Sequence, residues 1–435
     1  MGIQNFPAVL QPIIQQGFLE HAFYESLTAT TAYRQIADKE PFPVGVGETL
    51  TKTRTGLRPV ATTPLAPSTN TNFDNGLTSS VPGVEQYTLT VNKYGDTVDL
   101  NLVSQKVGIL NQFMINARQL GEQVGRTMDV LAANALFGAY MGGNTRVNAT
   151  LGAPATTLGV DDIRGFQYVF VNGVQTAISS GHPLAVTVNG VAASVTGATA
   201  DGTNISTAPG GISGTLTTAA NVLVANGTLG NAVISGIAPS ILRPNGRATT
   251  AALVAGDTMA MIANVLQAKT NMQLNGVPAI NGAYPCYLDP QALQGLFSDA
   301  DFKLLYRGAY GSQEYKEGEI ISLLGIRFTP TTMAPQQNLG GLNVRRAIVV
   351  GGGALIEADF PLETPETDNP LAEVYTQEGV RFTNRAPMDR LQEIIAQSWT
   401  WTGGFCVPTD TTANPTVLPT ATNAAYKRAV MIESL

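Results

Sequence analysis

The clearest hydrophobic pattern in the sequence lies between residues 101 and 137. From Val103 to Ala135, apolar or small residues recur at alternating steps of four and three positions. This spacing puts them on one side of a helix, which at about 1.5 Å per residue would be roughly 55 Å long. Gly142-Gly143 should end it, because glycine readily takes the left-handed conformation found after helices. The residues beside the stripe are mostly Gln and Asn rather than the charge pairs of a coiled coil. We therefore expect a long helix packed on its own domain or on a sister subunit.

A weaker helical pattern precedes a change of character at Pro41. The apolar residues that recur there at roughly helical spacing are Ile14, Phe18, Phe23, Leu27 and Ile36. Proline lacks the backbone donor that a helix needs, so the helix should lie within residues 12 to 40. We interpret residues 1 to 45 as an N-terminal arm, with Phe18 and Phe23 as candidate contacts to a neighbouring subunit.

Residues 46 to 99 indicate a long β-hairpin. Their many prolines exclude a long helix, and two β-prone runs, Thr49 to Val60 and Glu85 to Leu100, flank a segment rich in Pro, Thr, Ser and Asn. A two-stranded hairpin is only marginally stable by itself. This one should therefore lie on another surface, in the same chain or in a neighbour.

Two sets of side chains in strand-like runs are candidates for contacts between subunits. Alternation along a strand puts Lys52, Arg54 and Arg58 on one face of the first hairpin strand. That face is either solvated or meets carboxylates of a neighbouring subunit, and the sequence favours neither reading. Trp399 and Trp401 share one face of the run from Leu391 to Val407, where they should anchor a core or an interface.

Three Asn-Gly pairs punctuate residues 144 to 246. Asn172-Gly173, Asn189-Gly190 and Asn226-Gly227 each lie between β-prone runs. Asn-Gly takes positive φ at low cost and is the strongest short signal for a β-hairpin. Three hairpins provide six short strands, which predict a small all-β module, either an immunoglobulin-like sandwich or a barrel. Because the flanking segments are helical or mixed, we interpret the module as an inserted domain with a core of its own.

The remaining sequence mixes helix and strand. Residues 247 to 270 carry a helical pattern with Leu253, Ala260, Met261 and Leu266 on one side. Strand-like runs follow at Ala283 to Leu288, Gly318 to Leu323, Gly325 to Thr329, Arg346 to Val350, Leu391 to Val407 and Ala425 to Ile432. Strands so far apart in the sequence should share a sheet, which predicts an α+β fold.

Charge is scarce and unevenly spread. The 435 residues include 25 Lys or Arg and 32 Asp or Glu, which is 13% charged against roughly 25% in an average soluble domain. Residues 165 to 242 contain a single charged side chain, Asp201. The net charge of −7 argues against a nucleic-acid binder that uses a basic face. The surface of residues 165 to 242 should instead be covered by Thr, Ser, Asn and Ala.

The sequence contains no recognisable catalytic or metal-binding constellation, so we expect no enzyme, cofactor or metal. His21 and His182 have no ligand partner at a suitable spacing, and Cys286 and Cys406 are interpreted as free thiols. Gly351-Gly352-Gly353 should be a turn rather than a dinucleotide site. The acidic run from Glu357 to Glu373 could hold a divalent cation, but a solvated loop is the simpler interpretation.

No signal for a membrane or for secretion stands out. No apolar run approaches the 18 or more residues of a spanning helix. The first residues lack the basic and apolar stretches of a signal peptide. We therefore expect neither membrane insertion nor export.

The order of the segments resembles the major capsid proteins of tailed bacteriophages, which have the Hong Kong 97-type fold. Three stretches carry the local resemblance. Asn92 to Val98 (NKYGDTV) is similar to the junction of hairpin and spine helix in that family. Gly282 to Leu296 resembles a strand that leads into a short helix, and Gly318 to Thr329 resembles the strand-turn-strand that follows. The resemblance covers about three quarters of the chain, namely everything outside residues 144 to 246.

The resemblance implies a domain organisation. Residues 1–45 would be the N-terminal arm, 46–99 the extended loop, 100–143 the spine helix of the peripheral domain and 144–246 the inserted all-β domain. Residues 247–435 would form the axial domain and the rest of the peripheral domain.

The resemblance also implies a function. Hexamers and pentamers would form an icosahedral shell around double-stranded DNA, without sequence-specific binding. Portal and scaffolding proteins, and possible decoration proteins, would be partners, and the virion would be assembled in the host bacterial cytoplasm. An encapsulin-like shell and a surface adhesin or glycan-binding protein built on the β module are the alternatives.

Overall fold

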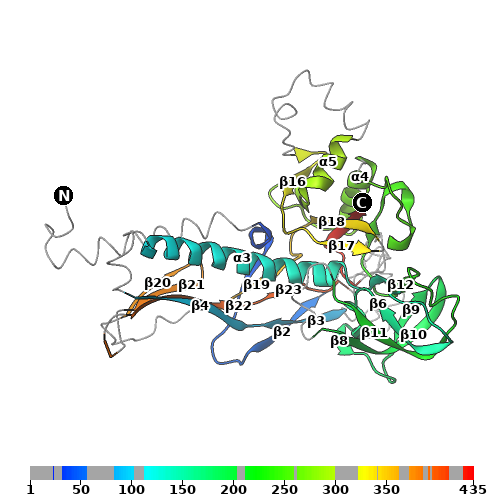
Figure 1. Ribbon diagram of the computed structural model, residues 1–435, viewed down its shortest axis with the longest axis horizontal. Coiled ribbons are helices and arrows are strands. Elements are labelled where there is room, and N and C mark those ends of the chain that lie inside the picture. The colour runs from blue at the N-terminus through cyan, green and yellow to red at the C-terminus, as the bar shows by residue number, and fades with distance from the viewer. Residues whose placement is uncertain are drawn as a thin grey trace, which may run out of the picture. The chain divides into compact units, whose positions relative to one another are not determined.

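A computed structural model describes residues 23, 32–55, 83–101, 112–202, 211–258, 262–298, 322–339, 341–361, 372–385, 390–391, 394–410 and 425–435. The chain divides into two compact units. The first comprises Met1–Leu50, Thr88–Ala133 and Leu355–Cys406, and the second comprises Thr51–Tyr87, Asn134–Ala354 and Val407–Leu435. Helices and strands are interleaved in a mixed α and β fold (Figure 1), as the sequence predicts. None of the described helices has the length and apolar character needed to cross a membrane.

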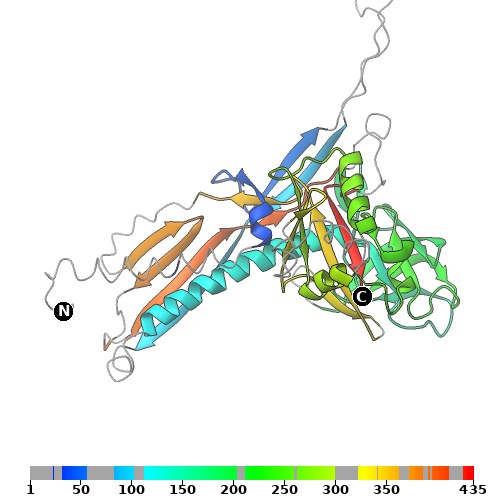
Figure 2. The same ribbon diagram turned by 90° about the horizontal axis from the view of Figure 1, so that it is seen from above.

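The first unit is built on a four-stranded antiparallel sheet covered by one long helix. The strands, in spatial order, are β20 (Ala372–Gln377), β21 (Val380–Arg385), β22 (Ile394–Gly403) and β4 (Asn92–Asn101). Helix α3 (Gln112–Tyr140) lies along one face of this sheet (Figure 2). The predicted apolar stripe faces the sheet, where Ala117, Val124 and Met128 pack among Phe382, Trp399 and Trp401. Gly143 has φ of +83° just after the helix, so the predicted helix end is confirmed.

The second half of the predicted hairpin belongs partly to this sheet. Strand β3 (Val84–Thr90) pairs with β2 (Thr49–Thr55), as predicted. The strand is interrupted at Val91, and β4 then pairs with β22 over ten residues. The prediction of one continuous hairpin strand is therefore wrong, because Tyr94 and Val98 of β4 pack into the core beneath α3.

The N-terminal prediction of helix up to residue 40 is also wrong at its end. A single 3-10 turn, η2 (Tyr33–Ile36), is followed by strand β1 (Asp38–Pro41). Strand β1 lies parallel to β19 (Ile356–Asp359), which also pairs with β23 (Phe405–Cys406). The turn is fixed by Asp129, whose carboxylate accepts the backbone N–H groups of residues 32, 33 and 34 at 2.9, 2.6 and 3.2 Å. Apart from residue 23, residues 12 to 31 lie outside the described part of the chain.

Six strands of the second unit form a closed barrel (Figure 1). In spatial order they are β5 (Asn144–Arg146), β12 (Ala232–Ser235), β9 (Leu184–Val188), β10 (Val191–Ala200), β11 (Gly214–Val222) and β6 (Ala155–Val160). The barrel closes where Val147, directly after β5, bridges to Val160 of β6. The fully buried members of its core all come from residues 147 to 233. Of the two predicted architectures, the strand pairing corresponds to the barrel.

Two of the three predicted Asn-Gly hairpins are confirmed. Asn172-Gly173 joins β7 (Tyr168–Val171) to β8 (Val174–Ala177), and Asn189-Gly190 joins β9 to β10, with positive φ at all four residues. The hairpin predicted at Asn226-Gly227 is wrong. Its flanking strands pair elsewhere, and a Cβ at Gly227 would collide with the Leu151 side chain. Close packing, not a turn, explains that glycine.

A seven-stranded mixed sheet completes the second unit. Its path is β13 (Ile241–Leu242), β24 (Ala429–Ser434), β18 (Leu342–Val350), β14 (Tyr284–Leu288), β16 (Ile326–Pro330) and β15 (Ser322–Leu323), with β17 (Gln336–Leu339) also paired to β18. Helices α4 (Ile262–Leu274) and α5 (Pro290–Ser298) contribute to its core. The predicted strands at 283–288, 325–329 and 346–350 are confirmed to within a few residues.

The helix predicted over residues 247 to 270 is wrong in its first half. The 3-10 turn η5 (Pro244–Gly246) directly precedes this stretch, and a second one, η6 (Thr250–Ala252), lies within it before α4 begins. The predicted apolar side of α4 is also wrong, because Leu266 is 42% exposed while Val265, Ala268 and Met272 are buried. Contact with the seven-stranded sheet decides which side of α4 is buried. The hydrophobic pattern of one helix holds no information about that contact.

Candidate functional site

The described residues hold no arrangement typical of catalysis. No group of three or more His, Cys, Asp or Glu side chains among them is placed to bind a metal. His182 is exposed in a turn, and His21 lies outside the described residues. Burial raises the pKa of the Cys286 thiol to about 12, which keeps it protonated and a poor nucleophile. Gly353 has φ of +73° in a turn after β18, so the interpretation of Gly351-Gly352-Gly353 as a turn is confirmed.

The acidic run after residue 357 begins in the core rather than in a solvated loop. Glu357 is buried on β19 and accepts hydrogen bonds from the Arg34 guanidinium, the shortest at 2.7 Å. Arg34 also donates to the Glu378 carbonyl oxygen at 3.0 Å. At this position the solvated-loop interpretation is wrong, because the carboxylate connects two distant segments of the first unit. Residues 362 to 371 of the run lie outside the described part.

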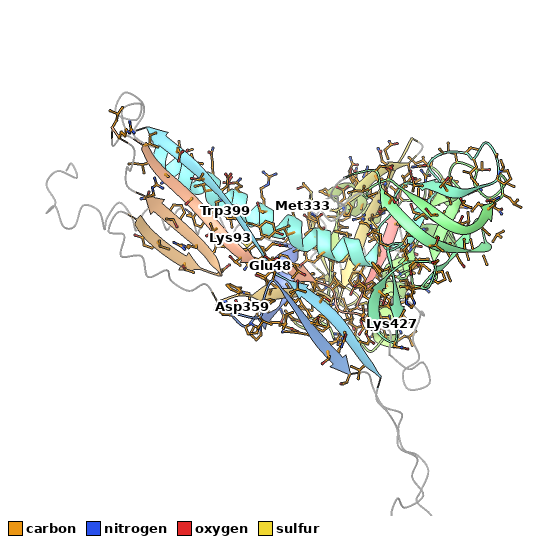
Figure 3. All side chains as sticks on the ribbon, turned by 90° about the horizontal axis from the view of Figure 1, so that it is seen from below. Glu48, Lys93, Met333, Asp359, Trp399 and Lys427 are labelled. Atoms are coloured by element: carbon orange, nitrogen blue, oxygen red, sulfur yellow. The ribbon has the colours of Figure 1, made fainter. Side chains whose placement is uncertain are left out.

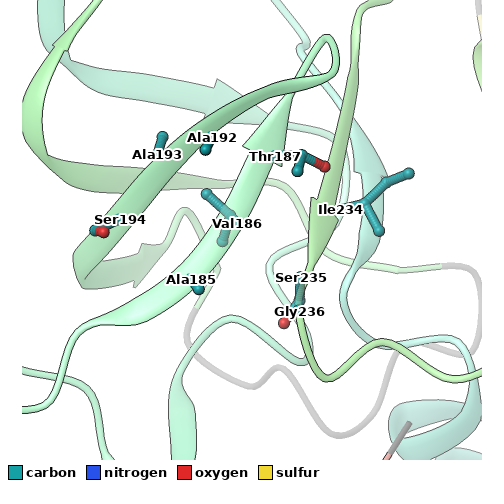
Figure 4. A pocket seen from close by; sticks show the side chains of 9 residues that line it. All are labelled: Ala185, Val186, Thr187, Ala192, Ala193, Ser194, Ile234, Ser235 and Gly236. Atoms are coloured by element: carbon teal, nitrogen blue, oxygen red, sulfur yellow. The ribbon is translucent and has the colours of Figure 1, made fainter. Parts of the chain in front are cut away.

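A shallow pocket on the barrel offers no reactive group (Figure 4). It has a volume of about 490 Å³ and is lined by β9, β10 and residues 234 to 236. Its side chains are aliphatic or carry a hydroxyl, as in Val186, Thr187 and Ser194. Such a lining can contact a neutral surface but can neither activate a nucleophile nor stabilise a charge.

A polar cluster lies at the loop end of the β2–β3 hairpin, where β2 ends and β3 begins. Asp410 stands between two arginines, 3.4 Å from Arg54 of β2 and 3.2 Å from Arg428. Arg428 also donates to the Gly352 carbonyl oxygen at 3.0 Å. A partly buried carboxylate between two guanidinium groups forms charge-assisted hydrogen bonds, which are stronger than neutral ones. The cluster therefore fixes β2 to the chain's C-terminal part.

The other strand of the hairpin is held by the neighbouring residue. The Thr409 hydroxyl donates to the Glu85 carboxylate of β3 at 2.8 Å, and both side chains are buried. Lys427, labelled in Figure 3, is near enough to Asp410 and Glu85 for their charges to act on it. Partial burial lowers the pKa of Lys427, although Asp410 and Glu85 oppose this by favouring its charge. Two consecutive residues of the C-terminal part thus hold both strands of the hairpin.

The structure places the predicted contact residues in three different situations. Arg54 meets a carboxylate of its own chain, Asp410, and Lys52 lies half-buried on the same face of β2. Phe18 and Arg58 lie outside the described residues. The role of Lys52, Arg54 and Arg58 towards a neighbouring subunit stays a prediction.

The aromatic candidates lie in a core of their own chain. Phe23, Trp399 and Trp401 are at most 3% exposed and belong to the core of the first unit. Phe23 stacks on Phe382 with ring centroids 4.6 Å apart, and the Trp399 indole donates to Gln123 of α3 at 3.2 Å. They are core anchors and leave almost no surface for a neighbour. The alternation of the strand correctly placed the two tryptophans on one face.

The polar cluster at the loop end of the β2–β3 hairpin was not predicted from the sequence. Thr409 and Asp410 lie in a stretch of Pro and Thr after a strand-like run, where polar residues are normally solvated. Their partners Glu85 and Arg54 are 324 and 356 positions away. No local pattern in one sequence links residues so far apart.

Sequence comparison finds no match, whereas structural comparison finds similar folds. No family model matches the chain, and no curated protein matches its sequence. The capsid structure of the cyanophage P-SCSP1u covers 92% of this chain and 87% of its own, at 14% identity and a TM-score of 0.50. The capsid of Ralstonia phage GP4 covers 92% and 87% at 12% identity and a TM-score of 0.48. The capsid of cyanophage Pam1 covers 94% and 92% at 11% identity and a TM-score of 0.48.

The likeness to the P-SCSP1u structure extends over nearly the whole of both chains. At this level of identity it shows the fold alone. The chain therefore has the fold of a phage capsid protein, in agreement with the resemblance read from the order of its segments.

Proposed function

We propose that this protein is the major capsid protein of a tailed bacteriophage. In this proposal many copies assemble into an icosahedral head shell that encloses double-stranded DNA. The observation that carries the proposal is the capsid fold, matched over 92% of the chain. It is supported by polar clusters that connect distant segments of the chain, such as Asp410 with Arg54 and Arg428. The role is structural, not enzymatic.

The proposal assigns the elements as a Hong Kong 97-type fold. Residues 1–45 are the N-terminal arm, 46–99 the extended loop, and 100–143 the spine helix. The four-stranded sheet beneath α3, which takes β4 from the end of the extended loop, belongs to the peripheral domain. The seven-stranded sheet, apart from β13 (Ile241–Leu242), forms the axial domain within residues 247–435. The barrel within residues 144–246 is the inserted domain, exposed on the shell.

The physical basis of such a shell is a set of modest contacts repeated by symmetry. Each subunit offers a β2–β3 hairpin that can lie over a neighbour, with Lys52 on the same half-buried face as Arg54. A net charge of −7 suits a shell that holds DNA by confinement, since no basic surface need grip the phosphates. Hexamers and pentamers, a portal, a scaffold and possible decoration proteins are the partners this role requires. The virion is the location that follows.

Electron microscopy of the purified protein tests the proposal. The full chain is produced in bacteria, alone and with a co-expressed scaffold, and particles are examined by negative stain. We expect closed shells of uniform diameter. A compact monomer that persists under every condition would contradict the proposal. Shells that package a co-produced enzyme, and no DNA when the portal and packaging machinery are present, would favour the encapsulin alternative.

A further inference from the structure

We infer that the β7–β8 hairpin acts as a brace for the long hairpin. Together with the C-terminal part of the chain, it holds the loop end of β2–β3, where β2 ends and β3 begins, in one orientation before subunits meet. The orientation of the hairpin is a property of the free subunit. Its use in assembly rests on the proposed function.

The first support is a backbone contact at the Asn172-Gly173 turn. The Gln86 amide of β3 donates to the Gly173 carbonyl oxygen at 3.2 Å. A Cβ added to Gly173 would lie only 2.5 Å from the Val84 carbonyl oxygen and 3.4 Å from Glu85 Cα. The turn is thus pressed directly against β3, at a distance that only glycine allows. Figure 1 shows β8 beside β3.

The second support is that the same β7–β8 hairpin contacts the C-terminal part. The hydroxyl groups of Tyr168 and Tyr426 are 3.4 Å apart, and the rings of Phe170 and Tyr426 meet edge to face at 6.1 Å. Tyr140, at the end of α3, adds a third ring at 5.9 Å from Tyr426. Edge-to-face aromatic pairs fix orientation as well as burying area. The brace is therefore anchored at both ends.

The third support is the polar cluster already described. Tyr426 directly precedes Lys427 and Arg428, and Arg428 shares Asp410 with Arg54 of β2. Thr409 holds Glu85 of β3, one residue from the Gln86 amide that bonds to the turn. Three segments, at positions 168–177, 407–410 and 425–428, thus converge on the loop end of one hairpin. Each of the two hairpin strands has at least one charge-assisted bond to them.

The consequence is preorganisation. A two-stranded hairpin without further contacts is only marginally stable, so binding would have to order it at a cost in entropy. A braced hairpin is already ordered in the free subunit, so binding loses less entropy. The barrel region is then more than a module that can be removed without effect, because deleting it also removes the brace.

The chain contains a matched pair of glycines for the test. Gly173 and Gly190 occupy the same position of Asn-Gly turns, with φ of +79° and +78°. A Cβ at Gly190 has no atom within 4 Å, whereas one at Gly173 meets β3. Gly173→Ala and Gly190→Ala therefore carry the same backbone strain and differ in the contact with the long hairpin.

Hydrogen–deuterium exchange of the unassembled full-length protein is the readout. We expect Gly173→Ala to speed exchange of the Gln86 amide and its β3 neighbours by roughly two- to tenfold, the range for one lost backbone hydrogen bond. Gly190→Ala should leave β3 unchanged. Equal exchange of β3 in the two variants would overturn the inference.

A second pair of variants tests the contact between the C-terminal part of the chain and β2. Asp410→Asn weakens the bonds to Arg54 and Arg428, and Asp161→Asn weakens a similar pair with Arg146 in the barrel, at 3.1 Å. Faster exchange in β2 with Asp410→Asn alone supports the inference, and no difference contradicts it. Hydrogen exchange is measured on free subunits, so it tests the brace separately from the proposed function. The brace can be refuted although shells form, and it can be supported although no shells form. Where shells form, their yield should fall for Gly173→Ala relative to Gly190→Ala.

Discussion

The barrel and the seven-stranded sheet are built in opposite ways. The barrel core comes from one continuous stretch between residues 147 and 233. The sheet combines strands from residues 241–242, 284–288, 322–350 and 429–434. Most of the barrel sequence, residues 165 to 242, contains one charged side chain. The sheet contains Glu433, which is 1% exposed and bonded to Arg243 and Arg346 at 2.8 and 3.1 Å.

This difference explains part of the low charge of the protein. Segments that are adjacent in sequence can be organised by turns and apolar alternation, which need no charge. Segments that are distant are connected by buried ion pairs, each specific in geometry. The buried pair of Arg34 with Glu357 likewise connects distant segments of the first unit. A chain with few charges thus uses several of them in its interior. Apart from the local pair of Asp162 with Arg164 in the barrel region, the buried pairs named here connect distant segments.

The largest expected effect comes from removing the buried carboxylate of the sheet. Glu433→Ala leaves Arg243 and Arg346 buried without their partner, which costs about 3–5 kcal/mol. The free energy of local unfolding of β18 and β24, from hydrogen exchange, measures this loss. Glu122→Ala is the control, because its pair with Arg118 is exposed and 3.9 Å long, so its removal should cost less than about 1 kcal/mol. Similar losses in both variants would refute the assigned role of Glu433.

A somewhat smaller effect is expected in the barrel. Leu216→Ala removes a fully buried side chain of the barrel core and should cost about 2–5 kcal/mol. Since that core is self-contained, faster exchange should be confined to residues 144 to 235. Leu229→Ala, at a residue 61% exposed, serves as the control and should change little. Faster exchange throughout the seven-stranded sheet would show that the barrel is not an independent core.

The smallest expected effect is a difference in pH dependence between the two regions. Burial by itself would raise the pKa of Glu433, but Arg243, Arg346 and Thr250 together hold it below the usual 4.5. The unfolded state therefore binds more protons in this range, and stability falls as pH drops below about 4.5 towards the folded pKa. Exchange rates between pH 3 and 6, corrected for intrinsic chemistry, should rise more at low pH in β24 than in β9 and β10. Glu433→Gln should flatten the response of β24, and an unchanged response would contradict the assignment.

Local chemistry made the barrel partly predictable. The seven-stranded sheet and the polar cluster at the loop end of the β2–β3 hairpin could not be predicted in this way, because their contacts join residues far apart in the sequence. The turns at Asn172 and Asn189 followed from residue type alone, because positive φ is a local preference. The pair at Asn226 failed because Leu151, far along the chain, occupies the space beside Gly227. The contacts of Asp410 with Arg54 and of Arg34 with Glu357 span 356 and 323 positions and leave no local pattern. For the same reason the sequence could not decide between a core and an interface for Trp399 and Trp401, which pack with Phe23 in the core of the first unit.

The most direct test of the central claim is a three-dimensional reconstruction of the assembled particle by cryo-electron microscopy. The account predicts a closed icosahedral shell whose repeating unit matches this fold. The β2–β3 hairpin should lie over a neighbouring subunit, and the barrel of residues 144 to 235 should face outward. Particles without icosahedral symmetry, or a β2–β3 hairpin that contacts no neighbour, would contradict it.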